Sequence, residues 1–186
     1  MCARRAWNIA ASVGRSRVPE PTVHLALVCP EIGGNAGNVG RLCLNVGARL
    51  HLVHPLGFQT DEKAVRRAGL DYWKHVDVVE HPSLDAFDAW LDGAPGPEGA
   101  GIAGRVYPLS SHGSAMYADI RFCIGDVLVF GRESVGLPLD WVERRGGYRI
   151  PMVGATRSLN VSNAAAILAY EALRQLRPEL FGPGVA

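Results

Sequence analysis

Three loop-like segments concentrate the residue types that could bind a small ligand or support chemistry. The first, residues 30–41 (PEIGGNAGNVGR), is rich in glycine and asparagine, which permit tight turns and close approach to a ligand. The second, residues 130–138 (FGRESVGLP), breaks a buried strand at glycine and continues with an arginine–glutamate pair. The third, residues 150–163, combines Arg157 with several amides and hydroxyls. Such loops can offer backbone amides and carbonyls to a ligand, and arginines can hold phosphate.

Each of these loops also has a purely structural interpretation. The first could be a satisfied loop with a surface arginine, and the second an ordinary strand-to-helix connection. In the third, Asn160 and Ser162 are residue types that favour helix N-caps. Capping alone leaves unexplained why so many polar groups gather at one helix start, beside Arg157.

Metal and dinucleotide chemistry are not predicted. Cys2, Cys29, Cys43 and Cys123 form no CxxC pair, which argues against a zinc cluster and suits a reducing cytoplasm. The histidines of HLVH, residues 51–54, are three apart in a strand-like run and therefore point to opposite faces. The GxGxxG at residues 99–104 follows a Pro/Gly-rich loop and runs into a strand, the wrong context for a pyrophosphate site.

The elements that must position these loops alternate between strands and helices. Strands are expected at 23–29, 49–54, 76–80, 101–109, 126–130 and 148–150; helices are expected from about 39 to 46 and at 61–68, 83–91, 138–144 and 161–176. Ser83 is a candidate N-cap. This alternation predicts an α/β fold, a parallel sheet with helices on both faces, in which ligands gather at the carboxyl ends of the strands.

Length and composition favour one domain. The 186 residues are 48% hydrophobic and 20% charged, enough for a packed core. We expect a tail at residues 1–22, a single domain at 23–181 and a short tail at 182–186, with the Gly/Pro-rich stretch 92–104 as a loop inside the domain. No apolar run reaches the roughly 18–20 residues of a membrane span. A net charge of +1 excludes a polycation.

Taken in order, four motifs resemble those of SPOUT-class RNA methyltransferases. They read PEIxxNxGNxxR, LHLVxPLGF followed by RRAGLDYW, FGRExxGLP and IPM…RSLNxSNAxAxxxYEAxRQ, and they cover nearly all of residues 24–177. Within that class the chain is most similar to the small tRNA 2′-O-methyltransferases of the anticodon wobble nucleotide. Gly33-Gly34 departs from the pattern, where relatives often carry prolines. The resemblance implies a C-terminal trefoil knot, a cytoplasmic homodimer and a tRNA substrate, with no membrane or DNA partner.

The resemblance also implies a site. S-adenosylmethionine, which becomes S-adenosylhomocysteine, would be held without a metal by Leu109, Gly131, Ile150 and Ser158. The catalytic positions would be Arg41, Asn35, Glu133, Asn160 and Tyr170. Arginine is always charged, so Arg41 suits a phosphate or a developing alkoxide better than a literal base role. Tyr170 would lie about 15 Å from Asn160 along one helix, so two subunits would have to share the site.

Two alternatives remain open at this point: a SPOUT 2′-O-methyltransferase with another RNA target, and a non-catalytic RNA-binding α/β module. The basic residues that could meet RNA form two clusters, Lys63–Arg66–Arg67 and Arg144–Arg145–Arg149. Tyr72 and Trp73 could stack on an unpaired base or pack in the core.

Overall fold

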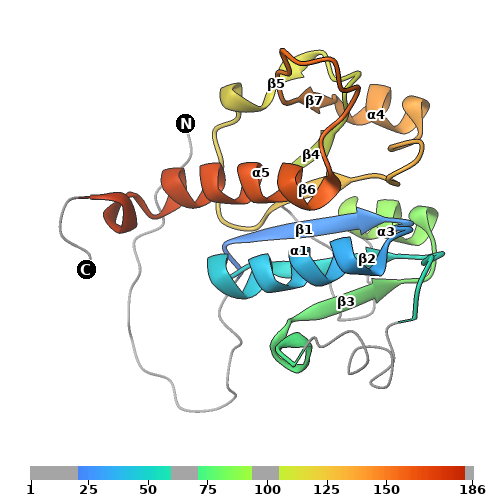
Figure 1. Cartoon of the computed structure of the whole chain (residues 1–186), viewed down its shortest axis with the longest axis horizontal. Coiled ribbons are helices and arrows are strands. Elements are labelled where there is room, and N and C mark those ends of the chain that lie inside the picture. Colours follow the sequence, from blue (N-terminus) through green and yellow to red (C-terminus); the bar gives the residue numbers. More distant parts are fainter. Residues whose placement is uncertain (1–20, 60–70, 94–104, 183–186) are drawn as a thin grey trace.

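The computed structural model describes residues 21–59, 71–93 and 105–182. Their centre is a seven-stranded sheet in the order β3-β2-β1-β6-β4-β7-β5, in which every pair of named strands is parallel (Figure 1). The strands are β1 (Val23–Val28), β2 (Arg49–Val53), β3 (Val78–His81), β4 (Val106–Leu109), β5 (Ala115–Met116), β6 (Asp126–Phe130) and β7 (Tyr148–Arg149). The predicted α/β fold with a parallel sheet is therefore confirmed.

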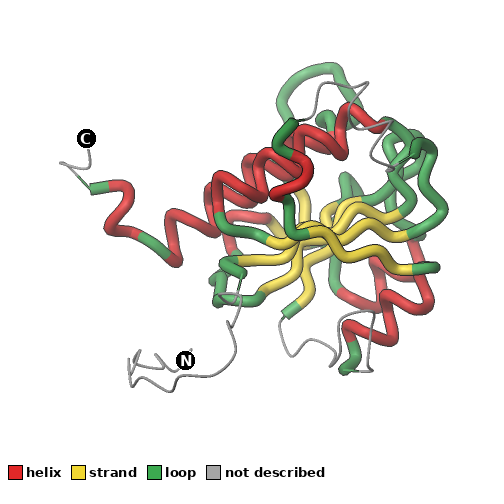
Figure 2. Tube along the Cα trace, turned by 90° about the horizontal axis from the view of Figure 1, so that it is seen from below, coloured by secondary structure: helices red, strands yellow, loops and turns green. Residues whose placement is uncertain are grey.

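Helices cover both faces of this sheet, because side chains alternate along each buried strand. Val23, Leu25 and Leu27 of β1 pack in one core with helices α1 (Gly33–Val46) and α5 (Val161–Leu176). Ala26 and Val28 face the other core, which contains residues of α3 (Leu84–Leu91) and α4 (Leu139–Arg145). Figure 2 shows helices on either side of the strands. Three 3₁₀ turns complete the described elements: η1 (Trp73–His75), η2 (Tyr117–Asp119) and η3 (Pro178–Phe181).

The sequence located most of these elements. The bounds of β6 and α5 are as predicted, and Ser83 caps α3 by accepting a hydrogen bond from the backbone N–H of Ala86 (3.1 Å). β3 begins two residues later than expected, at Val78, and the two-residue strand β5 was not predicted. The expected helix 61–68, the residues before 105 in the expected strand 101–109, most of the loop 92–104 and most of the N-terminal tail lie outside the described residues.

The prediction that residues 30–38 form a loop is wrong, because the helix already begins at Gly33. α1 begins at Gly33, not near residue 39, and Arg41 is therefore eight residues into the helix rather than one turn. Glycine and asparagine have low helix propensity, so local sequence favours a loop here. Burial of Ala36 and Val39 against the sheet, together with capping from a distant loop, outweighs that preference.

A buried row of three histidines crosses β1, β2 and β3. His24 Nδ1 lies 2.8 Å from His51 Nε2, and His51 Nδ1 lies 2.9 Å from His81 Nε2. The three rings pack against Phe87 and Trp90 of α3. Burial lowers the pKa of His24 and of His81 to about 4, and the pKa of His51 is lowered well below its ordinary value. The row is therefore neutral at physiological pH.

His51 and His54 are separated as predicted. His51 belongs to this buried row, whereas His54 is half-buried, with its Nε2 2.7 Å from a carboxylate oxygen of Glu80. Sequence spacing did not reveal the row, because its members are neighbours across strands rather than along one strand.

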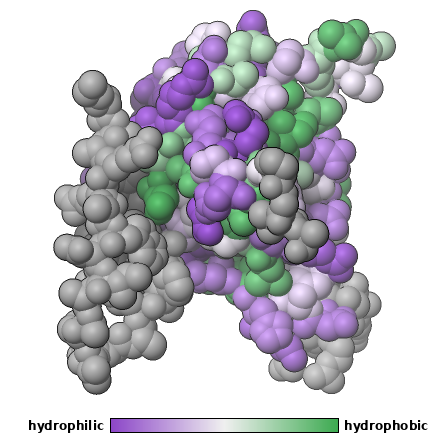
Figure 3. Space-filling model, turned by 90° about the vertical axis from the view of Figure 1, so that its left-hand side faces the viewer, coloured by the Kyte–Doolittle hydropathy of each residue, from purple (hydrophilic) through white to green (hydrophobic). Residues whose placement is uncertain are grey.

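The end of the molecule at which the C-terminal part of α5 lies mixes hydrophilic and hydrophobic residues (Figure 3). No helix among the residues that the structure describes is both long and apolar enough to cross a bilayer.

Candidate active site

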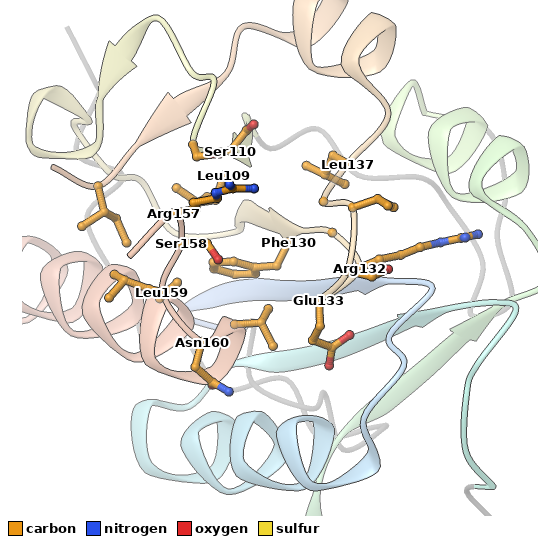
Figure 4. Close-up of a pocket in the computed structure, with 18 of the residues that line it drawn as sticks. Leu109, Ser110, Phe130, Arg132, Glu133, Leu137, Arg157, Ser158, Leu159 and Asn160 are labelled. Atoms are coloured by element: carbon orange, nitrogen blue, oxygen red, sulfur yellow. The ribbon is translucent and has the colours of Figure 1, made fainter. Parts of the chain in front are cut away.

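A pocket of about 520 Å³ lies at the carboxyl end of the sheet. Its walls come from all three loops predicted from the sequence and from the segment after β4 (Figure 4). Ile32 and Asn35 come from the first loop, and residues 130–137 from the second. Ile150, Met152 and residues 157–161 come from the third. Parallel strands end on the same edge of the sheet, which brings loops distant in sequence together.

The loop after β6 is a tight turn closed by two backbone hydrogen bonds. The backbone N–H groups of Arg132 and Gly136 each donate to the carbonyl of the other residue, at 3.2 and 2.9 Å. Gly136 has φ +75°, which favours glycine. A Cβ on Gly131 would lie 2.2 Å from the backbone of Gly136 and Leu137, so only glycine fits there. The turn therefore fixes where Arg132 and Glu133 leave the backbone.

Glu133 caps the start of α1 from this distant loop. Its carboxylate accepts hydrogen bonds from the backbone N–H groups of Glu31 (2.8 Å) and Ile32 (3.3 Å), and from the Asn35 side-chain amide (2.8 Å). In return, the Glu31 carboxylate accepts from the backbone N–H and the hydroxyl of Ser134. Burial alone would raise the pKa of Glu133, but the bonds from Asn35 and the backbone lower it, so Glu133 is an anion beside a helix N-terminus.

A second set of hydrogen bonds joins the starts of α1 and α5. The Asn160 amide donates to the Asn35 side-chain oxygen (3.0 Å). The Asn160 side-chain oxygen in turn accepts from the backbone N–H and the hydroxyl of Ser162, and so caps α5. Glu133, Asn35 and Asn160 thus form one continuous polar chain across the three loops. They adjoin the pocket, and the structure shows them holding its walls together.

The four predicted cofactor positions all line the pocket, namely Leu109, Gly131, Ile150 and Ser158. The lining combines apolar side chains such as Phe130 and Leu159 with a glycine turn and exposed hydroxyls. The pocket volume lies in the usual range for small-molecule sites. Such a lining fits an amphiphilic nucleoside cofactor. No group of three or more metal-ligating residues occurs among residues 21–59, 71–93 and 105–182.

Two predicted catalytic residues do not line this pocket. Arg41 lies on the exposed face of α1, with its guanidinium 4.5 Å from the ring centre of Tyr72. Tyr72 in turn donates a hydrogen bond to the Gly37 carbonyl (2.9 Å), which fixes its ring. Tyr170 is 46% exposed on α5, which excludes core packing in this chain. Of Tyr72 and Trp73, the two aromatic residues considered for base stacking, Trp73 packs against the core and Tyr72 forms a cation–π contact with Arg41.

The basic cluster Arg144–Arg145–Arg149, near the end of α4, already interacts with other groups of the protein. Arg145 pairs with Asp88 (2.6 Å) and Asp92 (2.9 Å), and Arg144 lies 3.5 Å from Asp88. Arg149 donates to the Gly113 carbonyl. The cluster expected to meet RNA here is therefore tied to α3 and the protein backbone. The other predicted cluster, at residues 63–67, lies outside the described residues.

Sequence reasoning missed several residues of the site. Ser110 and His112 line the pocket just after β4, a segment that was not among the three loops. Glu31 and Arg132 were part of the motifs but received no role. The Glu133 carboxylate accepts from the backbone of Glu31, and the Glu31 carboxylate accepts from the backbone of Ser134. These partners lie about a hundred positions apart, so in the sequence only the occurrence of both motifs in one chain indicated a link between them.

Comparisons with known proteins agree with this geometry. Residues 22–170 match the model of the SpoU rRNA Methylase family. The chain is 45% identical over 155 residues to a tRNA (cytidine(34)-2′-O)-methyltransferase of Burkholderia ambifaria, covering 82% of this chain and 94% of that protein. It is 44% identical to the protein of the same name from Saccharophagus degradans, covering 82% and 95%.

Solved structures give the same result. One, described as giving insights into the 2-OH methylation of C/U34 on tRNA, is 45% identical with a TM-score of 0.74. The match covers 84% of this chain and 97% of that one. A SpoU methyltransferase of Streptomyces viridochromogenes, solved in complex with AdoMet, is 26% identical with a TM-score of 0.68, over 86% of this chain and 59% of that one.

Proposed function

Because the chain belongs to the SpoU RNA methylase family, we propose that it methylates the ribose 2′-hydroxyl of the wobble pyrimidine in a tRNA anticodon loop. The observation that carries this proposal is the pocket at the carboxyl end of the sheet, assembled from the motif loops that the chain has in common with that family. The relatives named above are tRNA (cytidine(34)-2′-O)-methyltransferases, and the match spans nearly their whole length. A tRNA substrate also fits the cytoplasmic location that the sequence predicts.

The pocket is the proposed site for S-adenosylmethionine, which supplies the methyl group. Leu109, Gly131 and Ile150 offer apolar contact and backbone groups, and Ser158 adds a hydroxyl. The chemistry needs no metal, because a sulfonium methyl is already activated. Calorimetry with and without a chelator tests this: we expect the same binding in both conditions, and loss of binding in chelator would overturn the assignment.

The reaction joins the methyl group to O2′ while the hydroxyl proton leaves. We propose that Arg41 stays charged and stabilises the developing alkoxide or the adjacent phosphate. Tyr170 is exposed and is the proposed proton relay: its phenol oxygen receives the hydroxyl proton while its own proton passes to solvent. Asn35, Glu133 and Asn160 act by holding the pocket walls in register, which supports reaction between oriented groups.

Neither Arg41 nor Tyr170 lines the pocket of its own chain, which supports a site shared by two copies. α5 offers a surface for pairing. Its exposed residues are Asn163, Ile167, Tyr170 and Arg174, spaced at i, i+4, i+7 and i+11 on one face. We propose a homodimer in which each pocket receives side chains from the other copy.

Mass spectrometry of nucleosides tests the proposed reaction. Total tRNA from cells lacking this protein is incubated with the purified chain and labelled S-adenosylmethionine, then digested. We expect label in 2′-O-methyl cytidine or uridine derivatives that map to the anticodon loop. Label in a methylated base, or label confined to ribosomal RNA, would overturn the proposal and favour another branch of the family.

A further inference from the structure

Two arginines stand apart from the others that the structure describes. Nine of the eleven arginines in residues 21–59, 71–93 and 105–182 contact a carboxylate, a carbonyl or an aromatic ring. Arg132 and Arg157 have no side-chain partner within those ranges, and both line the pocket. A chain with a net charge of only +1 must attract RNA through local cations, so free guanidinium groups at the site are informative.

The fold keeps these two cations free. Glu133 follows Arg132 in the sequence, but its carboxylate accepts hydrogen bonds at the start of α1 and forms no ion pair with Arg132. The tight turn at Gly136 places Arg132 on one wall of the pocket. Arg157 belongs to the third loop, in which all residues from 151 to 160 are exposed. In Figure 4 Arg157 lies beside Leu109 and Ser110, whereas Arg132 extends outward from the wall formed by the second loop.

We propose that Arg132 and Arg157 bind the two backbone phosphates that flank the target ribose, one on each side of the pocket. This assignment rests on the proposed function and adds to it how the RNA strand is held. A nucleotide whose ribose enters the pocket has one phosphate on its 5′ side and another on its 3′ side. A guanidinium binds phosphate oxygens in a bidentate manner and keeps its charge at any working pH.

The alternative anion is the amino-acid carboxylate of S-adenosylmethionine. That molecule has one carboxylate, so it accounts for only one of two cations that leave different walls. Phosphate contacts position a strand without reading its bases. We therefore expect these arginines to set where the strand lies, and other contacts to choose the base.

The test compares Arg132→Ala and Arg157→Ala with Arg121→Ala. Arg121 is exposed and lies on the segment before β6, at the opposite end of the strand from the pocket. Its guanidinium donates to the backbone carbonyls of Ala118 and Ile120. tRNA from cells lacking the protein is titrated at several salt concentrations, and cofactor binding is measured by calorimetry. Each pocket variant should weaken tRNA binding about tenfold or more. Each should also reduce the slope of log affinity against log salt by about 0.7, one phosphate's share on a single strand.

Cofactor affinity should be unchanged in both pocket variants, and Arg121→Ala should behave as the unchanged chain in every measurement. Arg132→Lys and Arg157→Lys should restore the salt slope but only part of the affinity, because lysine keeps the charge and loses the planar fork. Unaltered tRNA affinity and slope in both alanine variants would overturn the proposal. Loss of cofactor affinity with normal tRNA binding would also overturn it and assign that arginine to the carboxylate.

Failure of the proposed function would give different results from failure of the phosphate-binding proposal. If the unchanged chain binds tRNA but methylates a base, the 2′-O assignment fails, while the salt slopes still decide the role of the arginines. If the unchanged chain binds no tRNA at any salt concentration, both proposals fall together.

Discussion

Arg41 is a predicted catalytic residue that lies away from the pocket of its own chain. It stacks on the ring of Tyr72 on the exposed face of α1. Stacking on a fixed ring restricts the side chain, so less freedom is lost when it binds an anion. In the proposed site, Arg41 contacts the RNA or the second copy of the chain from this exposed position.

Substitution of Arg41 separates anchoring from cofactor binding. Arg41→Lys should reduce single-turnover methyl transfer but retain part of it, because the charge remains while the bidentate geometry is lost. Arg41→Ala should reduce transfer far more, by about a hundredfold or more, as expected for removal of one stabilising donor. Cofactor affinity should stay the same in both variants. Near-normal turnover of Arg41→Ala, or a defect in cofactor affinity alone, would remove Arg41 from the site.

At the scale of elements, sequence predicted what local pattern controls and missed what distant partners control. β6 and α5 have the predicted bounds because β6 is a continuous run of buried residues and α5 repeats its apolar residues at helical spacing over 16 residues. The start of α1 was missed because its capping group, Glu133, lies about a hundred residues away. β5 is only two residues long and pairs with β7 alone, so no periodicity could signal it. The trefoil knot implied by the resemblance stays a prediction.

Asn160 has two duties that a pair of variants can separate. Asn160→Asp keeps the side-chain oxygen that caps α5 but loses the amide that donates to Asn35. Asn160→Ala loses both. We expect Asn160→Ala to lower the free energy of unfolding by about 1–2 kcal/mol, the usual cost of an N-cap, and Asn160→Asp to retain most of that stability. Both should weaken cofactor binding, measured by calorimetry, because the bridge between α1 and α5 is lost. Normal cofactor affinity in Asn160→Asp would show that the bridge is dispensable.

The histidine row across β1, β2 and β3 predicts how this layer responds to acid. In the folded chain the pKa values of His24 and His81 lie at about 4, below their ordinary value of 6.5. The unfolded chain therefore binds more protons between these values, and stability falls as pH falls through that window. Between pH 7.5 and pH 5 we expect the free energy of unfolding to drop by about 2 kcal/mol for each of these two histidines, and so by about 4 kcal/mol together, at ~1.4 kcal/mol for each pH unit of separation.

Urea unfolding at the two pH values measures this drop. The control is His54→Gln, which changes a half-buried histidine outside the row and should leave the drop in place. His81→Leu should make the drop smaller, because one buried imidazole no longer has to gain a proton on unfolding. A pH-independent free energy of unfolding in the unchanged chain would contradict the neutral, buried row.

At the scale of the whole molecule, the proposed site requires two copies. Light scattering should give about twice the 20.0 kDa of one chain. Ile167→Glu places a charge on the exposed stripe of α5 and should produce a monomer with little methyl transfer but normal folding. The matched control, Ile124→Glu, changes an isoleucine outside α5 that is more exposed than Ile167 (47% against 37%) and should remain dimeric. A monomeric unchanged chain with full activity would refute the shared site.

The hydrogen bond between Asn35 and Asn160 has a consequence for folding during synthesis of the chain. These residues are 125 positions apart, and Glu31 and Ser134 are 103 apart, so the walls of one pocket leave the ribosome at widely separated times. A nascent or truncated chain that stops before α5 has neither Asn160 nor the third loop. Binding of the proposed cofactor would therefore begin only after α5 and the third loop have been made, and it would stabilise only chains that contain them. Cellular cofactor would in this way favour chains that contain α5 over chains truncated before it.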